Sequence, residues 1–279
     1  MIERDTPSQD KIVVSGFRHF FETADGPVQA TDHLDLMIRA GEFVTLVGPS
    51  GCGKTTLLKA LAGFIRPTEG TVLCDGKPVQ GPGRERGVVF QELAILPWRT
   101  VRRNIGHGLE IAGVSRLERE RTVARLIELT GLAGFEDRYP HELSGGMRQR
   151  VAVARTWAAD PDVILMDEPF AAVDAMTRLT LQEELVRLCT ATRKTVLFIT
   201  HSVDEAVFLG DRVLVMTRRP GRIKAVIDVP GRAAGRDWES FKIDAGLQAI
   251  AEQVLRLVRE ERGATAPSAA MTHAIGARA

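Results

Sequence analysis

The sequence has few aromatic residues, few cysteines and no long apolar run. Aromatic residues make up 5% of the 279 residues, so the core must be built mostly from aliphatic side chains. No apolar run approaches the roughly 20 residues that a membrane-spanning helix needs, and we expect no membrane span. The three cysteines are odd in number and widely spaced. This predicts reduced thiols in a cytosolic protein rather than a disulfide framework or a zinc site.

The sequence also lacks an excess of charge of either sign. It holds 37 Lys and Arg residues against 36 Asp and Glu residues, which leaves a net charge of +1. This balance argues against a nucleic-acid-binding protein that relies on bulk charge. What the chain does have is 44% hydrophobic and 26% charged residues, ordinary values for a globular protein. Its length fits one large domain or one domain with a subdomain.

Short apolar runs that stop abruptly at a polar or glycine residue predict the core of the fold. These runs cover residues 43–47, 87–90, 163–166 and 195–200. Continuous apolar runs of this length are typical of strands buried on both faces, as in a parallel sheet. Stretches with helical periodicity lie between them, so the pattern predicts an α/β fold with helices that cross between parallel strands.

Two other regions have a different pattern. Residues 12–36 and 71–79 are broken by turn residues at Asp25-Gly26 and Asp75-Gly76, which predicts a small antiparallel sheet near the N-terminus. Residues 92–160 are mostly helical in pattern, with a predicted helix that stops at Gly131. We expect this segment to be a helical subdomain inserted between two strands of the sheet.

The predicted domain spans residues 10–240, and the pattern changes after it. Apolar residues at helical spacing predict one amphipathic helix over 241–262. Residues 263–279 have no periodicity, and we expect a disordered tail there.

A glycine-rich segment predicts a phosphate-binding loop. Gly48, Gly53, Lys54 and Thr55 follow the spacing G-x-x-x-x-G-K-[ST], between a predicted strand and a predicted helix over 56–62. The N–H groups of such a loop surround an anion, the helix N-terminus adds partial positive charge, and the lysine supplies a full charge. The residues expected at the nucleotide are Gly48, Pro49, Ser50, Gly51, Cys52, Gly53, Lys54, Thr55 and Thr56. The alternative is a glycine-rich turn without a ligand.

Two carboxylates end the buried run at 163–166. Asp167 and Glu168 would be costly to bury there unless they were paired or bound to a ligand. At the carboxyl end of a parallel strand they would face the phosphate-binding loop. We expect Asp167 and the Thr55 hydroxyl to hold Mg²⁺, and Glu168 to accept a proton from the attacking water. The alternative for each acid is a turn or helix cap.

Polar residues also follow two other predicted strands. Gln91 follows the run at 87–90, and His201 follows the run at 195–200. We expect Gln91 to coordinate Mg²⁺ or water, and His201 to contact the γ-phosphate. Lys54, Gln91, Asp167 and His201 together predict a site for nucleotide hydrolysis.

The most specific string in the chain is Leu143-Ser144-Gly145-Gly146-Met147. Ser144 is a good helix N-cap, and the glycines permit close approach of another backbone. The string resembles the signature of ATP-binding-cassette (ABC) ATPases, which implies a P-loop NTPase fold with a mixed core sheet, an antiparallel β subdomain and a helical signature subdomain. The resemblance also implies ATP and Mg²⁺ as ligands, and a head-to-tail dimer in which Ser144, Gly145 and Gly146 contact the nucleotide bound by the other copy.

Two further positions match the family. The resemblance implies that Phe21, or less favourably Phe20, stacks on adenine; the alternative is a plain core phenylalanine. Asp174 matches the D-loop of the family, which contacts the second nucleotide. The usual Ser-Ala-Leu-Asp is here Ala171-Ala172-Val173-Asp174, so a serine hydroxyl at the dimer contact is missing.

Three strings resemble ATPases of nitrate, sulfonate and taurine importers. They cover residues 96–101, 201–206 and 218–223. This resemblance implies an ATP-hydrolysing subunit bound to membrane permease subunits at the cytoplasmic face of the inner membrane, with a solute-binding protein as an indirect partner and no nucleic acid. In that group the segment around Trp98 contacts the permease; the alternative for Trp98 is core packing of the helical subdomain.

Three other functions stay open at this stage. The chain could energise the import of another small solute, or it could be a non-transport ABC protein that acts in translation or DNA repair. Such proteins usually carry two cassettes or a long coiled-coil insert, whereas this chain has one cassette and no sustained heptads. A P-loop kinase or GTPase is disfavoured because it has no use for the string at 143–147.

Overall fold

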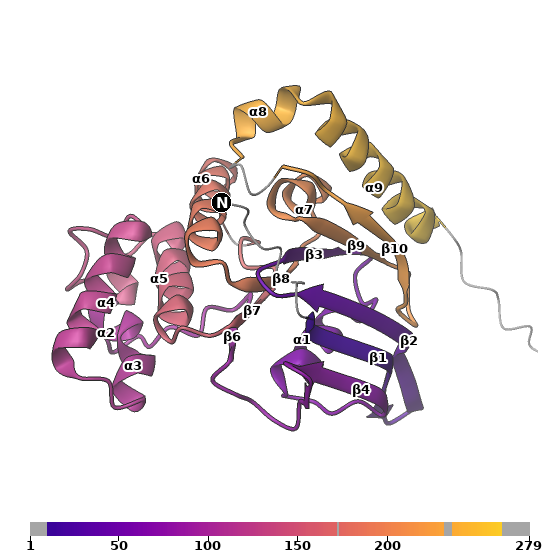
Figure 1. Ribbon diagram of the computed structural model, residues 1–279, viewed down its shortest axis with the longest axis horizontal. Coiled ribbons are helices and arrows are strands. Elements are labelled where there is room, and N and C mark those ends of the chain that lie inside the picture. Colours follow the sequence, from indigo (N-terminus) through magenta and orange to yellow (C-terminus); the bar gives the residue numbers. More distant parts are fainter. Residues whose placement is uncertain (1–9, 172, 232–235, 264–279) are drawn as a thin grey trace, which may run out of the picture.

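The computed structural model describes residues 10–171, 173–231 and 236–263, and two sheets form the centre of the molecule (Figure 1). The larger sheet has the strand order β10-β9-β3-β8-β7-β6. Its strands are β3 (Phe43–Val47), β6 (Arg86–Val89), β7 (Val163–Asp167), β8 (Thr195–Ile199), β9 (Arg212–Met216) and β10 (Ile223–Asp228). All neighbours pair in parallel except β9 and β10, which are antiparallel. The expected mixed core sheet is therefore confirmed, with β6 one residue earlier than predicted and β8 ending at Ile199.

The smaller sheet is antiparallel, as the turn residues predicted. Its order is β2-β1-β4-β5, and the strands are β1 (Asp10–Thr23), β2 (Gly26–Arg39), β4 (Glu69–Cys74) and β5 (Lys77–Pro78). The chain turns at Asp25 between β1 and β2, and at Asp75-Gly76 between β4 and β5. Both Asp75 and Gly76 have positive φ, which explains why Asp and Gly are suited to this turn.

The apolar residues of the core sheet point to both faces, and each face is covered. One face packs on α1 (Lys54–Ala62) and on the small sheet through Val44, Leu46, Leu165 and Leu197. The other face packs on helices through Phe43, Ile164, Met166, Val196 and Phe198. These helices are α5 (Gly145–Ala158), α6 (Ala175–Thr192), α7 (Val203–Leu209) and α9 (Ala245–Gly263). Burial on both faces is why the strands read as continuous apolar runs.

The predicted insertion is helical and projects from the core on the left of Figure 1. It contains α2 (Val101–Ile105), α3 (His107–Ile111), α4 (Arg116–Leu129), the 3₁₀ helix η1 (Pro140–Glu142) and α5. Gly131 lies just beyond α4 with φ of 62°, as expected of the residue that stops a helix. Val123, Leu126 and Ile127 are buried, as the periodicity indicated.

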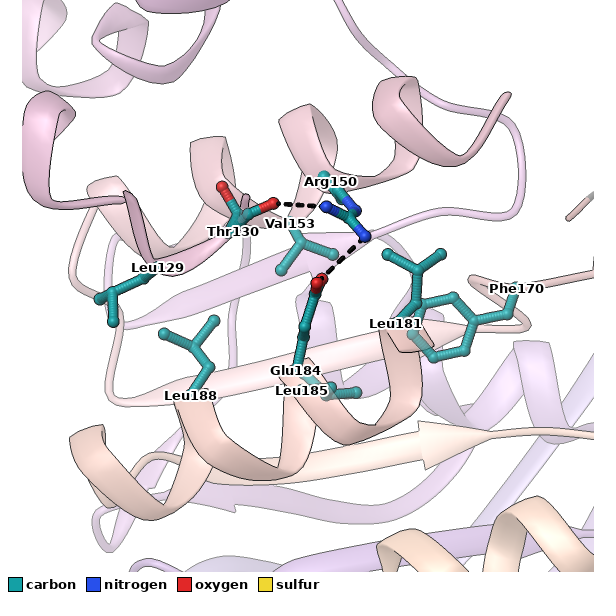
Figure 2. Close-up of a pocket in the computed structure, with 9 residues that line it drawn as sticks. All are labelled: Leu129, Thr130, Arg150, Val153, Phe170, Leu181, Glu184, Leu185 and Leu188. Carbon is teal, nitrogen blue, oxygen red and sulfur yellow. Dashed lines mark hydrogen bonds and ion pairs between the residues drawn. The ribbon is translucent and has the colours of Figure 1, made fainter. Parts of the chain in front are cut away.

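An ion pair links this insertion to the core. Arg150 on α5 lies 3.0 Å from a carboxylate oxygen of Glu184 on α6, and it donates a hydrogen bond to the carbonyl of Thr130 (Figure 2). Leu181, Leu185 and Leu188 of α6 line the small apolar cavity beneath this pair. The insertion is thus joined to the core along α5, which packs on the sheet and is linked to α6 by this ion pair.

The prediction of one helix over 241–262 is wrong at its start. A short helix α8 (Trp238–Ile243) precedes α9, because the carboxylate of Asp244 accepts a hydrogen bond from the N–H of Leu247 and caps α9. The tail predicted over 263–279 lies outside the described residues, apart from Gly263 at the end of α9. Among the helices of the described part, none combines the length and apolar character needed to cross a bilayer.

Candidate active site

The glycine-rich loop joins β3 to α1 at the carboxyl edge of the core sheet. Gly51 and Gly53 have φ of 73° and 102°, in the left-handed region that favours glycine. A Cβ on Gly53 would also come within 2.7 Å of the Thr31 side chain on β2. This position therefore needs glycine both for its backbone conformation and because the small sheet packs against the loop.

Lys54 is the first residue of α1 and is almost fully buried, with 5% of its surface exposed. Its Nζ donates hydrogen bonds to the carbonyl oxygens of Gly48 and Pro49, both at 2.9 Å. The loop thus folds around its own lysine, and the ammonium group is held at the helix N-terminus. This arrangement concentrates positive charge where the sequence predicted phosphate binding.

A cavity of about 230 Å³ lies above this loop and collects many of the predicted residues. It is lined by Phe21, Val28, Ala30, Ser50, Gly51, Cys52, Gly53, Lys54, Thr55, Thr56, Glu168, His201 and Arg219. The loop, the aromatic residue, one carboxylate and the histidine come from separate segments of the chain. Their convergence in one cavity is what a nucleotide site requires.

Glu168 and His201 face each other at one side of the cavity. A carboxylate oxygen of Glu168 lies 2.5 Å from Nε2 of His201. The backbone N–H of Glu168 donates to the carbonyl of Ile199, and its φ of 46° is unusual for a residue other than glycine. The strand ends therefore hold the carboxylate in one orientation.

Asp167 is buried beside the loop, with 8% of its surface exposed. Its Oδ1 has no hydrogen-bond partner. Burial raises the pKa of this carboxyl above its ordinary value, and Thr55 and Lys54 oppose that shift. A buried, incompletely paired carboxylate oxygen next to a hydroxyl fits a hard divalent cation. No cluster of three His, Cys, Asp or Glu side chains suited to a metal occurs in the described residues, so the nucleotide and water would have to complete its coordination.

Phe21 lies at the end of β1 and is 41% exposed. Its ring contacts His19 edge-on at 4.6 Å between centroids and lines the cavity. The alternative of a plain core phenylalanine is therefore wrong. Phe20 does not line the cavity, so the structure favours Phe21 as the residue beside a base.

The signature residues lie away from this cavity. Ser144 caps α5, because its hydroxyl accepts a hydrogen bond from the N–H of Met147 at 3.2 Å, which confirms the predicted cap. Gly145 and Gly146 begin the helix, and a Cβ on Gly146 would lie 2.4 Å from the Thr177 side chain on α6. The three signature residues do not line the cavity of their own chain.

Asp174 lies next to the signature rather than in the cavity. It caps α6 by accepting a hydrogen bond from the N–H of Thr177 at 3.0 Å, and that bond lowers the pKa of its carboxyl. Since Thr177 also contacts Gly146, the two segments form one surface. Ala172 of the D-loop lies outside the described residues.

Gln91 does not reach the site as the sequence predicted. Strand β6 ends at Val89, and Gln91 lies two residues further on with an exposed side chain that does not line the cavity. The reason is that β6 is the edge strand, and the chain leaves the sheet before Gln91. A role for Gln91 at the metal stays a prediction.

Trp98 is 71% exposed, so the alternative of core packing is wrong. It lines a groove of about 980 Å³ on the helical insertion. The charged residues of this groove are Arg99, Arg102, Arg103, Glu110, Arg116, Arg119, Glu120, Glu128 and Glu136. The groove and the cavity share no lining residue.

Two features of the site were missed from the sequence. Arg219 lines the cavity from the turn between β9 and β10, although no local pattern indicated it. Behind His201, the buried carboxylate of Glu205 accepts hydrogen bonds from Gln182 Nε2 and the Thr200 hydroxyl, and Thr200 accepts one from the N–H of Ser202. These bonds fix the backbone on both sides of His201.

Comparisons with known proteins agree with this site. The family model described as ABC transporter matches residues 31–171. An uncharacterized ABC transporter ATP-binding protein of Methanocaldococcus jannaschii is 54% identical over 219 residues, which cover 78% of this chain and 82% of that protein. The taurine import ATP-binding protein TauB of Roseobacter denitrificans is 47% identical over 218 residues, covering 78% of this chain and 81% of that protein.

A solved structure of similar fold has nucleotide bound. A dimeric ATP-binding cassette in a post-hydrolysis state, bound to ADP and Pi, aligns with a TM-score of 0.70 and 29% identity, over 79% of this chain and 99% of that chain. The expected fold and family are thereby confirmed. With its phosphate-binding loop, paired carboxylates and signature helix in these positions, this chain belongs to the ABC transporter family and is one of its ATP-binding cassettes.

Proposed function

We propose that this chain binds and hydrolyses ATP to power an ABC importer of small anions. The observation that supports it most is the cavity that brings together Lys54 of the loop, Glu168 and His201. A cation at a helix N-terminus binds phosphates, and a carboxylate in the same cavity can take a proton from water.

Each cavity residue has a distinct proposed task in this reaction. Phe21 stacks on the adenine, and the loop N–H groups with Lys54 hold the β- and γ-phosphates. Glu168 accepts the proton of the attacking water, and His201 holds Glu168 and contacts the γ-phosphate. The hydrogen bonds among Gln182, Glu205 and Thr200 keep the backbone at His201 in place while the side chain of His201 changes partners during the reaction.

The residues present fit a magnesium ion. Asp167 and Thr55 would hold it, with Gln91 as a further candidate ligand. When bound, Mg²⁺ neutralises charge on the phosphates. The unpaired Oδ1 of Asp167 is the observation that supports this assignment.

A second copy of the chain completes the proposed site. Ser144 caps α5 and Gly145 and Gly146 begin it, where the first N–H groups of a helix have no partner within the helix. None of the three lines the cavity of its own chain, and Asp174 caps α6 beside them. In a head-to-tail dimer this surface would cover the triphosphate held by the other copy. The similar cassette that is dimeric and bound to ADP and Pi supports the dimer.

The groove around Trp98 is proposed to bind a membrane permease. An exposed tryptophan in a concave surface is a common anchor of protein interfaces. The resulting complex would place the chain at the cytoplasmic face of the inner membrane, with a solute-binding protein as an indirect partner. Taurine, an alkanesulfonate or nitrate is the proposed solute, because the relatives include taurine import ATP-binding proteins.

The hydrolytic assignment is tested with the purified chain, ATP and Mg²⁺. We expect saturable phosphate release, and we expect Glu168→Gln to lower turnover by at least about 100-fold with ATP binding retained, because a general base contributes about 10²–10⁴-fold. Glu239→Gln, at an exposed residue of α8, serves as the matched control. Wild-type turnover in Glu168→Gln would contradict the assignment of the base.

The transport assignment is tested by recovery of partners from a detergent extract. We expect the tagged chain to bring down a polytopic membrane protein. Recovery of ribosomes or DNA instead would support the non-transport alternative and contradict the importer.

A further inference from the structure

Arg219 is the cavity residue that the proposed mechanism leaves without a task. In the described part of the chain, Lys54 and Arg219 are the Lys and Arg side chains that line the cavity. Lys54 is buried and bonded to loop carbonyls, whereas Arg219 is exposed. An exposed guanidinium at the mouth of a phosphate site can form bidentate, charge-assisted hydrogen bonds to an anion.

The turn that carries Arg219 lies directly on the phosphate-binding loop. The N–H of Gly221 donates to the carbonyl of Ala30 at 2.9 Å, and the N–H of Asp32 donates to the carbonyl of Gly221 at 3.0 Å. A Cβ on Gly221 would lie 1.9 Å from the carbonyl oxygen of Cys52. The turn therefore has no space to move toward the loop.

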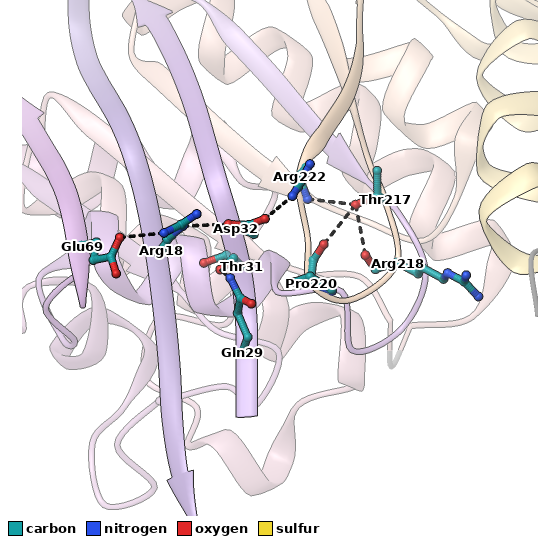
Figure 3. Close-up of polar contacts among 9 residues, drawn as sticks. All are labelled: Arg18, Gln29, Thr31, Asp32, Glu69, Thr217, Arg218, Pro220 and Arg222. Carbon is teal, nitrogen blue, oxygen red and sulfur yellow. Dashed lines mark hydrogen bonds and ion pairs between the residues drawn. The ribbon is translucent and has the colours of Figure 1, made fainter. Parts of the chain in front are cut away.

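A buried carboxylate ties the same turn to the small sheet (Figure 3). Asp32, 6% exposed, accepts hydrogen bonds from the guanidinium of Arg222 and from Nε of Arg18 at 2.7 Å. Arg18 continues the network to Glu69 at 2.9 Å. The N–H of Arg222 also donates to the Thr217 hydroxyl, which closes the turn on itself.

The C-terminal helix holds the turn from its other side. A carboxylate oxygen of Glu261 on α9 accepts a hydrogen bond at 3.0 Å from the N–H of Arg218, the residue before Arg219. Lys224 on β10 pairs with Glu261 at 2.8 Å and with Glu260 at 2.7 Å. Helix α9 thus contacts the backbone that sets the position of Arg219.

We propose that Arg219 binds the diphosphate portion of the nucleotide, and that Glu261 is a positioning residue that holds Arg219 over the cavity. This proposal rests on the proposed nucleotide function. It gives the C-terminal helix a role in nucleotide affinity. The antiparallel sheet and α9 would both hold the turn that carries Arg219.

The contact is tested by titrating the purified chain with ADP and Mg²⁺, which avoids turnover. We expect Arg219→Ala to weaken ADP binding about tenfold, and Arg219→Lys by no more than about threefold since the charge is kept. The loss should shrink as salt is raised, because the side chain is exposed. Arg187→Ala on α6 is the control and should bind as wild type.

The outcomes separate this proposal from the proposed function. Absence of nucleotide binding by the wild-type chain would contradict the function itself. Wild-type binding together with unchanged affinity in Arg219→Ala would overturn the role of Arg219 alone.

The role of Glu261 is tested by a matched pair on α9. Glu261→Ala and Glu260→Ala each remove one partner of Lys224, but only Glu261→Ala removes the bond to the Arg218 N–H. We expect Glu261→Ala to raise the KM for ATP about threefold with kcat nearly unchanged, and Glu260→Ala to change neither. In the Arg219→Ala background, Glu261→Ala should have no further effect. Equal effects of the two glutamate variants, or additive effects with Arg219→Ala, would overturn the positioning role.

Discussion

The cavity at the edge of the core sheet and the groove on the helical insertion present their central side chains in different ways. Lys54 in the cavity is 5% exposed and is held by two carbonyl oxygens, whereas Trp98 in the groove is 71% exposed. The cavity is built by strand ends and by a loop in which Gly51 and Gly53 adopt the left-handed conformation that favours glycine. The groove is lined largely by charged side chains, with the Arg99–Glu110 ion pair at 2.5 Å as one of its contacts.

This difference indicates what each region is complementary to. The cavity brings its loop, carboxylate and histidine together within one chain, as a site for a small ligand requires. The groove leaves a large apolar side chain in solvent, which is typical of a surface completed by another protein. Variants in the two regions should therefore separate nucleotide affinity from assembly.

The largest expected effect is at Lys54. We expect Lys54→Ala to weaken ATP binding by at least about 100-fold, because each charge-assisted hydrogen bond to a phosphate contributes about 1.5–3 kcal/mol. Lys59→Ala, at an exposed position on the same helix, is the matched control. Calorimetric titration measures both, and wild-type affinity in Lys54→Ala would mean that the loop is not the phosphate site.

A smaller effect is expected for Trp98, on the affinity for the permease rather than for ATP. We expect Trp98→Ala to weaken association with the permease about 30-fold, as loss of a central interface anchor costs about 2 kcal/mol. The ATPase activity of the isolated chain should stay unchanged. Ile243→Ala, at another highly exposed apolar residue outside the groove, should leave both properties intact; equal recovery of the permease by the two variants would count against the groove.

The smallest expected effect is on stability, at Asp167. Burial raises the pKa of this carboxyl, so the folded chain binds more protons than the unfolded chain between the ordinary and the raised pKa. Its ionised form therefore destabilises the fold as pH rises through that range. We expect Asp167→Asn to raise the free energy of unfolding by about 1 kcal/mol near pH 8, and by less near pH 4.

Urea unfolding of both proteins across that pH range measures the effect. The same substitution should abolish Mg²⁺-dependent turnover, so that stability and activity change in opposite directions. A loss of stability in Asp167→Asn at high pH would mean that groups of the chain itself stabilise the ionised carboxylate. That result would count against Asp167 as a ligand of a cation.

The sequence predicted those parts of the site that depend on local patterns. The loop from Gly48 to Thr55 has a fixed spacing, and Asp167 and Glu168 stand out because charges end a buried strand. The cap at Ser144 is also a local feature, since the hydroxyl bonds an N–H three residues on. In each case one short segment contains all the atoms that determine the structure.

The parts that the sequence did not predict depend on contacts between distant segments. Arg219 reaches the cavity because Gly221 pairs with Thr31, a contact that neither segment signals by itself. Gln91 was expected at the site, but an edge strand that ends at Val89 leaves it in solvent. The break between α8 and α9 depends on a single capping carboxylate at Asp244 within an otherwise helical pattern.

The most direct test of the account is the mass of Glu168→Gln in solution with ATP. In the proposed dimer, two copies enclose nucleotide between the loop of one and the signature helix of the other. Light scattering should therefore show a monomer of 30.5 kDa without nucleotide, and a dimer of twice that mass with ATP. Loss of this dimer in the double variant Glu168→Gln, Ser144→Arg would agree with the geometry. Glu168→Gln that binds ATP yet stays monomeric at saturating ATP, and that binds its permease as a single copy, would contradict it.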